Sequence, residues 1–265
     1  MLSKHRKDMN AMKLGAQLYS VRDRVKTPEE LRATLLALKE MGYVNAQFSG
    51  VPEMGADVWA EISRETGMPI VCTHMDYERI VNDTDALIEE HKKFGCSVIG
   101  LGGMPGEYRN TLAGLEKFLS EMEEPVKKMT AAGMHFSYHN HWFEFEPFTD
   151  GEGCAFDIML ERCPDWFFLI DVAWAQFAKC SAAEYIRKIG KDRIMNVHFK
   201  DYTNPETWQS LVSCGSGIVP FEEIIEACRE MGVENVLVEQ DTAPSTENSL
   251  GEMAKSAAYL LPLLK

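Results

Sequence analysis

Four side chains of the kinds that bind metal ions each stand at or near the end of a short apolar segment. They are His139 in the stretch SYHNHWFEFE, Asp171 in LIDVAW, His198 in VHFKDY and Glu239 in VEQD. Imidazole nitrogens and carboxylate oxygens bind Mn²⁺, Co²⁺, Fe²⁺ and Zn²⁺. Two carboxylates in one pocket are costly unless a cation or a proton compensates their charge. If the fold brings the four residues together, they predict a divalent-metal site.

The segments that would position these residues repeat one pattern: a helix-like stretch ends in glycine, and an apolar, strand-like run follows. LKEMGYVNAQF and MTAAGMHFSYHNH are two examples. Glycine suits the left-handed conformation that ends many helices. Six glycines stand at such junctions: Gly42, Gly67, Gly95, Gly133, Gly190 and Gly232. A seventh junction carries Pro164, and KLGAQLYSV adds an opening strand, so eight strands are predicted.

Regular alternation of strand and helix predicts a parallel sheet. Eight units in about 250 residues fit a single α/β domain, a (β/α)8 TIM barrel over residues 13–265, behind a loose tail at residues 1–12. An open, doubly wound sheet is the alternative, and the lack of a GxGxxG motif after the first strand weakens its dinucleotide-binding version. Helices are predicted behind a capping box at residues 27–30, over residues 109–132 and over residues 246–261.

In such a barrel the chemistry lies where the strands end. Side chains alternate along a strand, so Tyr138 should face the outer helices and His139 the barrel axis. The same alternation places five ligand-type or cationic residues on the inner face: His139, Asp171, His198, Lys200 and Glu239. Four of the seven histidines stand at strand ends: His74, His139, His141 and His198.

The composition limits the classes of function. A formal net charge of −14 disfavours contact with nucleic-acid phosphates. The seven cysteines contain no CxxC pair, so buried free thiols in a reducing cytoplasm are expected. The basic N-terminus precedes no apolar stretch, and no run could span a bilayer, so neither a signal peptide nor a membrane partner is expected. A homo-oligomer is compatible with the sequence.

Several segments together resemble the sugar phosphate isomerase/epimerase family of xylose isomerase-like barrels, from about Lys13 onward. They are GAQLYSVRD, YHNHWFEFE, LIDVAW, VHFKDY and VEQD. The family implies a metal bound by a Glu, an Asp, a His and a Glu from strands five to eight. Asp171, His198 and Glu239 match the last three positions. His139 stands where many relatives have Glu, and Trp174 where many have a His.

The His139 departure affects the chemistry that the resemblance implies. In the family's epimerases the glutamates of strands five and eight are also the acid/base pair. A metal-bound imidazole is a poor base, so only Glu239 of that pair remains. A second group, such as His141, Glu144 or Lys200, would suit a dehydratase or lyase equally well. The family's keto-inositol dehydratases also carry His-rich sequence at this strand.

The predicted function is a metal-dependent isomerase or epimerase that abstracts a proton next to the carbonyl of a sugar, keto-sugar or cyclitol, through an enediolate. Glu239 would be the main base, with His141 and Lys200 as further catalytic groups, and Mn²⁺ is favoured over Co²⁺, Fe²⁺ or Zn²⁺. The alternatives are a dehydratase or lyase acting on a keto-sugar or keto-inositol, and a non-catalytic sugar-binding barrel. A DNA-repair endonuclease of the same fold is disfavoured by the acidic charge and the few histidines.

Other polar residues have both a functional and a structural interpretation. Those predicted to contact substrate are Gln17, His74, Trp174 and Lys200. Lys200 either binds a substrate oxygen or pairs with Asp201 or another acid, and His141 either touches substrate or is structural. Glu144 and Glu146 are expected to be solvated loop charges. The loop at residues 214–217, CGSG, is either a phosphate site or a plain glycine turn.

Overall fold

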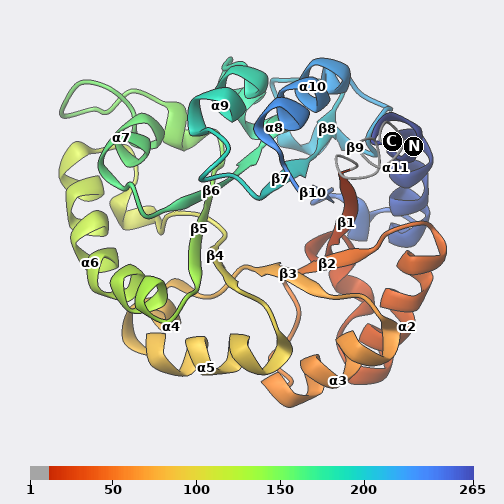
Figure 1. The fold of residues 1–265 in the computed structure, drawn as a ribbon. Helices are drawn as coiled ribbons and strands as arrows, with labels where there is room; N and C mark the ends of the chain where they lie inside the picture. Colours follow the sequence, from red (N-terminus) through yellow and green to blue (C-terminus); the bar gives the residue numbers. More distant parts are fainter. Residues whose placement is uncertain (1–11) are drawn as a thin grey trace, which may run out of the picture.

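The computed structural model describes residues 12–265 and shows a ring of parallel strands enclosed by helices (Figure 1). The strands of the ring are β1 (Lys13–Gln17), β2 (Asn45–Phe48), β3 (Ile70–Thr73), β4 (Val98–Leu101), β5 (His135–His139), β6 (Phe167–Asp171), β7 (Asn196–Phe199) and β10 (Asn235–Val238). Their order is β3-β2-β1-β10-β7-β6-β5-β4, so the first and last strands of the chain pair. A parallel bridge between Met75 and Leu101 brings the two ends of this sheet together. The predicted (β/α)8 barrel is therefore confirmed.

Helices cover the outside of the ring (Figure 1). They are α2 (Pro28–Glu40), α3 (Ala56–Thr66), α4 (Tyr77–Asn82), α5 (Thr84–Phe94), α6 (Leu112–Ala131), α7 (Ala155–Arg162), α8 (Val172–Phe177), α9 (Ala182–Ile189), α10 (Phe221–Met231) and α11 (Ser249–Leu263). Both α6 and α11 begin three residues later than predicted. In α6 the reason is Thr111, whose hydroxyl accepts a hydrogen bond from the amide of Gly114 and fixes the first turn.

The predicted helix ends agree with the backbone. All six junction glycines have positive φ angles, between 63° and 100°. At the start of α2 the hydroxyl of Thr27 accepts the amide of Glu30 at 3.2 Å, as a capping box requires. The returning bond from Glu30 goes to the amide of Lys26 instead of that of Thr27. The local sequence therefore specifies where most strands begin.

A two-stranded antiparallel hairpin follows β7 and was not predicted. It consists of β8 (Asp201–Tyr202) and β9 (Leu211–Val212). The carboxylate of Asp201 accepts the amides of Gly215, Gly217 and Val219 at 2.8–3.1 Å. Those amides are the donors that a phosphate would need, so the loop at residues 214–217 is a structural glycine turn. A Cβ on Gly217 would lie 2.2 Å from Asp201 Oδ1.

Inside the barrel, at the amino ends of the strands, three buried asparagines form a row. Asn45 donates to the side-chain oxygen of Asn235 at 2.7 Å, and Asn235 donates to that of Asn196 at 2.8 Å. Each is the first residue of its strand, β2, β10 or β7. Gly15 of β1 makes the first of these contacts possible, because a Cβ there would lie 2.0 Å from Asn45 Oδ1. We call Asn45, Asn235 and Asn196 the asparagine row.

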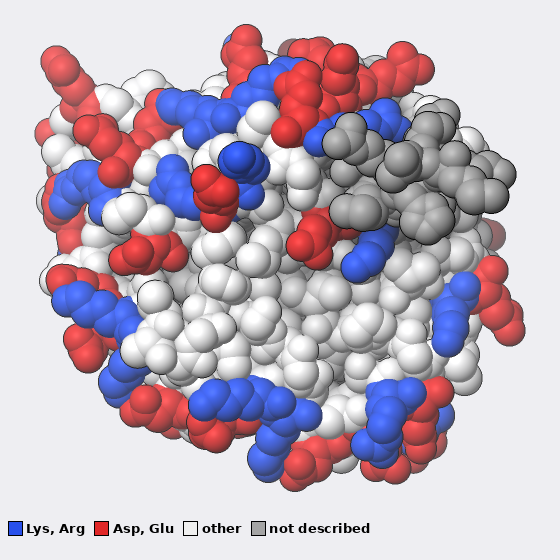
Figure 2. Space-filling model, viewed as in Figure 1, with Lys and Arg blue, Asp and Glu red and all other residues white. Residues whose placement is uncertain are grey.

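The remaining sequence expectations concern the surface and the tail. The predicted tail lies outside the described residues, apart from Met12, which is buried. None of the helices within residues 12–265 has the length and apolar character needed to cross a membrane. All seven cysteines are free thiols, as expected, but only five of them are buried, because Cys154 and Cys180 are half-buried. On the face shown in Figure 2, acidic and basic side chains interleave around the rim of an uncharged centre.

Candidate metal centre and active-site cavity

The four ligand-type residues meet at the carboxyl ends of four successive strands of the ring. His139, Asp171, His198 and Glu239 come from β5, β6, β7 and the residue after β10, and each offers one ligand atom within 4.8 Å of the others. His198 Nδ1 lies 2.9 Å from Glu239 Oε2, and His139 Nε2 lies 3.6 Å from Asp171 Oδ2. All four side chains are buried. The structure thus brings together the residues that strand alternation placed on the inner face, and we call these four residues the ligand cluster.

Each residue of the ligand cluster uses its other polar atom in a hydrogen bond. His139 Nδ1 donates to the carbonyl of Gly102 at 3.0 Å, and His198 Nε2 donates to Gln47 Oε1 at 2.5 Å. Glu239 Oε1 accepts from Gln17 at 2.6 Å, and Asp171 Oδ1 accepts the amides of Ala173 and Trp174. Hydrogen bonds of this kind fix the tautomer of a ligand histidine and the orientation of a ligand carboxylate.

The inward-facing atoms have no such partner. His139 Nε2, Asp171 Oδ2, His198 Nδ1 and Glu239 Oε2 are buried and accept or donate no hydrogen bond within residues 12–265. Buried polar atoms are rarely left unpaired, because losing water without replacement costs about 1–3 kcal/mol each. These four atoms converge on one point, where the two carboxylate oxygens contact the ammonium of Lys200 and the histidine nitrogens as ion pairs. The set of two nitrogens and two oxygens fits a metal ion and suits Mn²⁺, Co²⁺, Fe²⁺ or Zn²⁺.

The charge around the ligand cluster also fits a divalent cation. Lys200 places its ammonium 3.1 Å from Asp171 Oδ2, 3.0 Å from Glu239 Oε2 and 2.6 Å from Asp241 Oδ2. Three carboxylates and one ammonium leave two negative charges while the histidines are neutral. Lys200 therefore pairs with acids other than Asp201, the first acid considered from the sequence. A resident lysine compensates only part of the negative charge.

The pKa shifts of the groups in and beside the ligand cluster reflect the attraction between these carboxylates and the basic side chains. Burial opposes ionisation of Asp171 and Glu239, but Lys200 and the two histidines hold the pKa of both carboxyl groups well below their usual range. Burial likewise opposes the charged form of His198, yet Glu239 and Asp171 raise its pKa overall. The pKa of Lys200 is also raised, because the pull of Asp171, Asp241 and Glu239 outweighs burial. The negative field of the carboxylates thus favours the protonated forms of Lys200 and His198.

A cavity of about 550 Å³ adjoins the ligand cluster. Its polar lining includes His139, Glu239, His74, His141, Lys200, Asp241, Ser49 and Arg109. Burial, followed by the neighbouring His139, lowers the pKa of His74 and His141 well below the usual value, so both rings are neutral at neutral pH. The cavity therefore offers neutral imidazoles, one ammonium, one guanidinium and carboxylates to a polar ligand.

The predicted substrate residues do not all reach this cavity. His74 and Lys200 line it, whereas Gln17 lies behind Glu239 and acts through its hydrogen bond to that carboxylate. Trp174 is buried, with its ring centre 4.6 Å from the Lys200 ammonium. Within the described residues Trp174 lines a separate outer groove, with Trp142, Phe177 and Trp208, instead of the cavity beside the ligand cluster.

The expectation for Glu144 was wrong, whereas that for Glu146 agrees with its exposure. Glu144 has no exposed surface, and burial raises the pKa of its carboxyl to about 7. It accepts the hydroxyl of Tyr138 at 2.6 Å and the amide of His141 at 2.8 Å. A one-turn 3-10 helix, Phe143–Phe145, rotates Glu144 inward. Because it supports the backbone of His141, Glu144 is part of the wall that positions this histidine.

Sequence reasoning did not assign roles to Asp241 and Gln47. Asp241 lies two residues after Glu239, and this spacing was a usable signal that both could face the site. Gln47 is the last but one residue of β2, and its hydrogen bond to His198 joins two residues that are 151 positions apart in the sequence. This contact forms across the interior of the closed barrel, so local sequence patterns do not predict it.

Solved structures of other proteins share this fold. The chain matches a structure of a sugar phosphate isomerase/epimerase from Parabacteroides distasonis ATCC 8503 with 22% identity and a TM-score of 0.80, covering 96% of this chain and 100% of the other. It matches the IolI protein, solved with a bound zinc atom, with 13% identity and a TM-score of 0.75, covering 96% and 98%. It matches AsbF of Bacillus anthracis, described as a "probable 3-DHS dehydratase", with 12% identity and a TM-score of 0.70, covering 94% and 99%.

At these identities the solved structures establish the fold alone. No curated protein matches the chain. The family described as the xylose isomerase-like TIM barrel matches residues 36–262, which is most of the chain. Together with the ring of eight strands and the ligand cluster at their carboxyl ends, this match shows that the chain belongs to the xylose isomerase-like TIM barrel family.

Proposed function

We propose that this protein is a divalent-metal-dependent isomerase or epimerase that removes a proton next to the carbonyl of a sugar, keto-sugar or cyclitol. One observation carries the proposal: four buried ligand atoms that make no hydrogen bond within the described residues converge beside a polar cavity of about 550 Å³. A divalent ion bound there would polarise a substrate carbonyl and stabilise the charge of an enediolate. Mn²⁺ remains the favoured ion, and the zinc bound by the related IolI protein keeps Zn²⁺ as an alternative.

Glu239 is the proposed base. Its carboxyl group is ionised at neutral pH, because Lys200 and His198 outweigh the effect of burial on its pKa. Gln17 donates to Oε1 and leaves Oε2 facing the other ligands. That hydrogen bond fixes the carboxylate in one orientation, which proton abstraction requires. The ammonium of Lys200, 3.0 Å from Oε2, would stabilise an oxyanion that forms nearby.

His141 is the proposed second proton carrier. It follows β5, which is separated from β10 by β6 and β7 in the ring, so it approaches the cavity from a different side than Glu239. Its neutral ring and its unpaired Nδ1 allow it to accept or return a proton. Return of the proton to the opposite face of the same carbon gives an epimer, and return to the neighbouring carbon gives an isomer.

A dehydratase or lyase is the second candidate, and His139 favours it. This residue replaces the carboxylate that β5 would supply to a two-carboxylate epimerase, which leaves His141, after β5, and Lys200, after β7, as the proposed proton donors in the cavity. If the carbon next to the enediolate carries a hydroxyl, protonation of that hydroxyl would release water. The likeness to the dehydratase AsbF makes this outcome compatible with the fold.

The first test is metal content, measured by elemental analysis after incubation with Mn²⁺ or Zn²⁺ and removal of excess ion. Wild type should retain about one equivalent, and His198→Ala and Glu239→Ala should retain background levels. His135→Ala is the matched control, because His135 begins β5 at the opposite end of the barrel. If the wild-type protein binds neither ion, the metal-dependent reaction is contradicted, and a non-catalytic sugar-binding barrel becomes the better explanation of the cavity.

The second test follows proton exchange in D₂O, by proton NMR, across a panel of ketoses, aldoses and inososes. Deuterium at a carbon next to the carbonyl, with loss in Glu239→Gln, supports the proposed abstraction. Deuterium accompanied by a new sugar identifies an epimerase or isomerase, and deuterium accompanied by an unsaturated product identifies a dehydratase. Metal-loaded protein that exchanges no proton on any member of the panel would contradict the reaction but not the metal site.

A further inference from the structure

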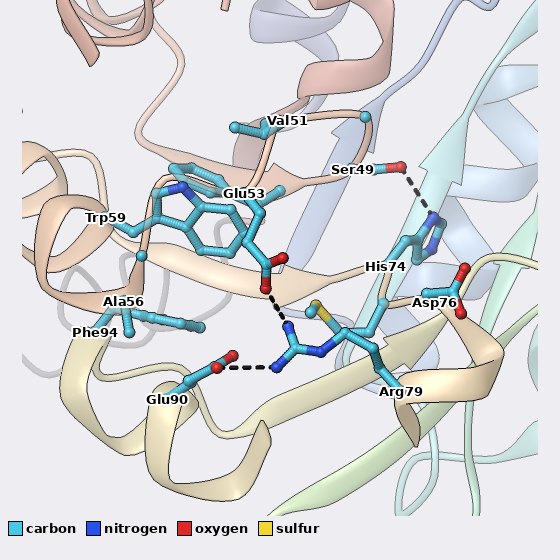
Figure 3. A pocket seen from close by; sticks show the side chains of 14 residues that line it. Ser49, Val51, Glu53, Ala56, Trp59, His74, Asp76, Arg79, Glu90 and Phe94 are labelled. Carbon is cyan, nitrogen blue, oxygen red and sulfur yellow. Dashed lines mark hydrogen bonds and ion pairs between the residues drawn. The ribbon is translucent and has the colours of Figure 1, made fainter. Parts of the chain in front are cut away.

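A second cavity, of about 190 Å³, lies directly beside the one that adjoins the ligand cluster. The two share four lining residues: Ser49, His74, Met75 and Asp76. Figure 3 shows Trp59, Ala56 and Phe94 on one side of this side cavity and His74 and Ser49 on the other. His74 forms the partition, because its ring lies 5.1 Å from that of His139 and its Nδ1 lies 3.3 Å from the Ser49 hydroxyl. A molecule bound near the ligand cluster could therefore extend past His74.

The floor of the side cavity is apolar and aromatic. Trp59 packs edge-on against Phe48, with ring centres 5.0 Å apart, and against Phe94 at 5.6 Å. Val51, Ala56 and Met75 complete the apolar lining. Trp59 is 8% exposed, and its indole N–H has no hydrogen-bond partner within the described residues. A buried indole N–H usually donates to an acceptor. The described lining of the side cavity provides no acceptor for Trp59, so a bound ligand could supply it.

Three of the charged residues that line the side cavity, Glu53, Arg79 and Glu90, pair with one another, and the carboxylate of Asp76 accepts the amide of Glu78 at the start of α4. Arg79 of α4 contacts Glu53 at 2.6 Å, Glu90 at 2.9 Å and Asp83 at 3.6 Å (Figure 3 shows the first two). These carboxylates raise the pKa of the guanidinium, with Glu90 contributing most. Three acids around one arginine leave no positive charge for an anionic ligand. The side cavity therefore suits an uncharged group.

We propose that the side cavity binds an uncharged, ring-sized apolar substituent carried by the substrate, such as an aromatic group attached to the sugar. This inference rests on the proposed function and names its substrate class. A cavity of about 150 Å³ lined by apolar side chains accommodates benzene, so 190 Å³ accommodates a six-membered ring with a small polar substituent. An oxygen on that group would accept the Trp59 N–H, while the sugar would lie beside His139, Glu239 and Lys200.

Binding at the side cavity is tested with 4-fluorophenol, followed by ¹⁹F NMR line broadening on the metal-loaded full chain. Wild type should bind it saturably. Ala56→Leu fills the side cavity and should weaken binding at least tenfold, while Ala60→Leu, on the same helix but outside the lining, should not. Trp59→Phe retains a ring, removes the N–H and should weaken binding severalfold. No saturable binding to wild type, or equal binding to Ala56→Leu, would overturn the assignment.

Substrate preference is tested with the phenyl and methyl glycosides of one keto-sugar, compared by kcat/KM for proton exchange. Burial of an aromatic ring should favour the phenyl compound by a factor on the order of 10–100, and Ala56→Leu should abolish the preference. Equal rates in wild type would refute the substrate class. The experiments distinguish failure of one proposal from failure of the other. If 4-fluorophenol binding depends on Ala56 but no proton exchange occurs, the side cavity binds a ring and the proposed reaction is wrong. If both glycosides exchange protons at equal rates, the proposed reaction holds and the proposed substrate class is wrong.

Discussion

The two ends of this barrel bury polar side chains in opposite ways. At the amino ends of the strands, the asparagine row is made of neutral amides that hydrogen-bond to one another, leaving one oxygen, that of Asn45, without a partner. At the carboxyl ends, the ligand cluster presents to a common point four atoms that make no hydrogen bond within the described residues, beside an excess of negative charge. The first arrangement is held by hydrogen bonds among its own residues, whereas we propose that a cation completes the second.

This contrast separates a structural polar core from a functional one. Both regions are deeply buried, so burial alone does not distinguish them. What distinguishes them is charge and direction, because the asparagine row is neutral and its amides hydrogen-bond to one another. In the ligand cluster each residue makes a hydrogen bond with its outer atom and turns its other atom toward a common point, an arrangement that favours a binding site.

The largest expected effect comes from Asp171→Asn, which makes the ligand cluster chemically similar to the asparagine row. Asparagine can still cap α8, so the helix should persist, while one of the charges that attract a cation is lost. Elemental analysis should show metal at background level, and proton exchange should be abolished, with an unchanged circular dichroism spectrum. A variant that retains a full equivalent of metal would remove Asp171 from the ligand set.

A second substitution, Asn235→Leu, interrupts the asparagine row without touching the ligand cluster. It leaves the amide of Asn45 and the carbonyl of Asn196 without partners, at about 1–3 kcal/mol each. Urea unfolding should show that loss of stability, while metal content per folded protein remains one equivalent. Asn82→Leu, at an exposed position, is the control. A loss of metal in Asn235→Leu would show that the two ends are not independent.

Glu144 extends the comparison to a third kind of buried polar group. It is a buried acid near the ligand cluster, and a bound proton neutralises its charge, whereas a metal ion would compensate the charges of the cluster. Its pKa of about 7 exceeds the usual 4.5, so the folded state retains a proton that the unfolded state has released. The stability from this proton is fully present below pH 4.5 and is lost as the pH rises to 7. The change amounts to about 3 kcal/mol.

The measurement is the unfolding free energy of wild type and Glu144→Gln between pH 4.5 and 7.5, with a chelator present. The wild-type value should fall relative to the variant across this interval, and the two curves should be parallel above it. Glu146→Gln, two residues away and exposed, should follow wild type throughout. Parallel curves for wild type and Glu144→Gln over the whole range would mean that Glu144 is ionised in the folded protein.

Much of this architecture could be predicted from the sequence, because it depends on local rules. The junction glycines marked helix ends, and side-chain alternation placed His139, Asp171 and His198 on the inner face, where the structure has them. These features follow from backbone geometry over a few residues, which is independent of how the ring closes. The number and parallel direction of the barrel strands follow from the same rules.

The features that were missed depend on distant contacts or on short irregular turns. Gln47 and His198 meet only because β2 and β7 face each other across the closed ring. Glu144 is buried because a single 3-10 turn follows β5, and helical or strand periodicity does not describe such a turn. Trp174 stands three residues after Asp171, in the first turn of α8, which places its indole behind Lys200 and in the outer groove instead of in the cavity lining.

Asp171 divides its carboxylate between two structures. One oxygen caps α8 through the amides of Ala173 and Trp174, and the other faces the ligand cluster. Helix formation and cation binding therefore share one chemical group, and each favours the ionised, correctly rotated carboxylate that the other needs. By thermodynamic linkage, an ordered α8 increases the affinity for the cation, and a bound cation stabilises α8 by the same factor. The amide protons of Ala173 and Trp174 are thus built-in reporters of occupancy, readable by hydrogen exchange without any substrate.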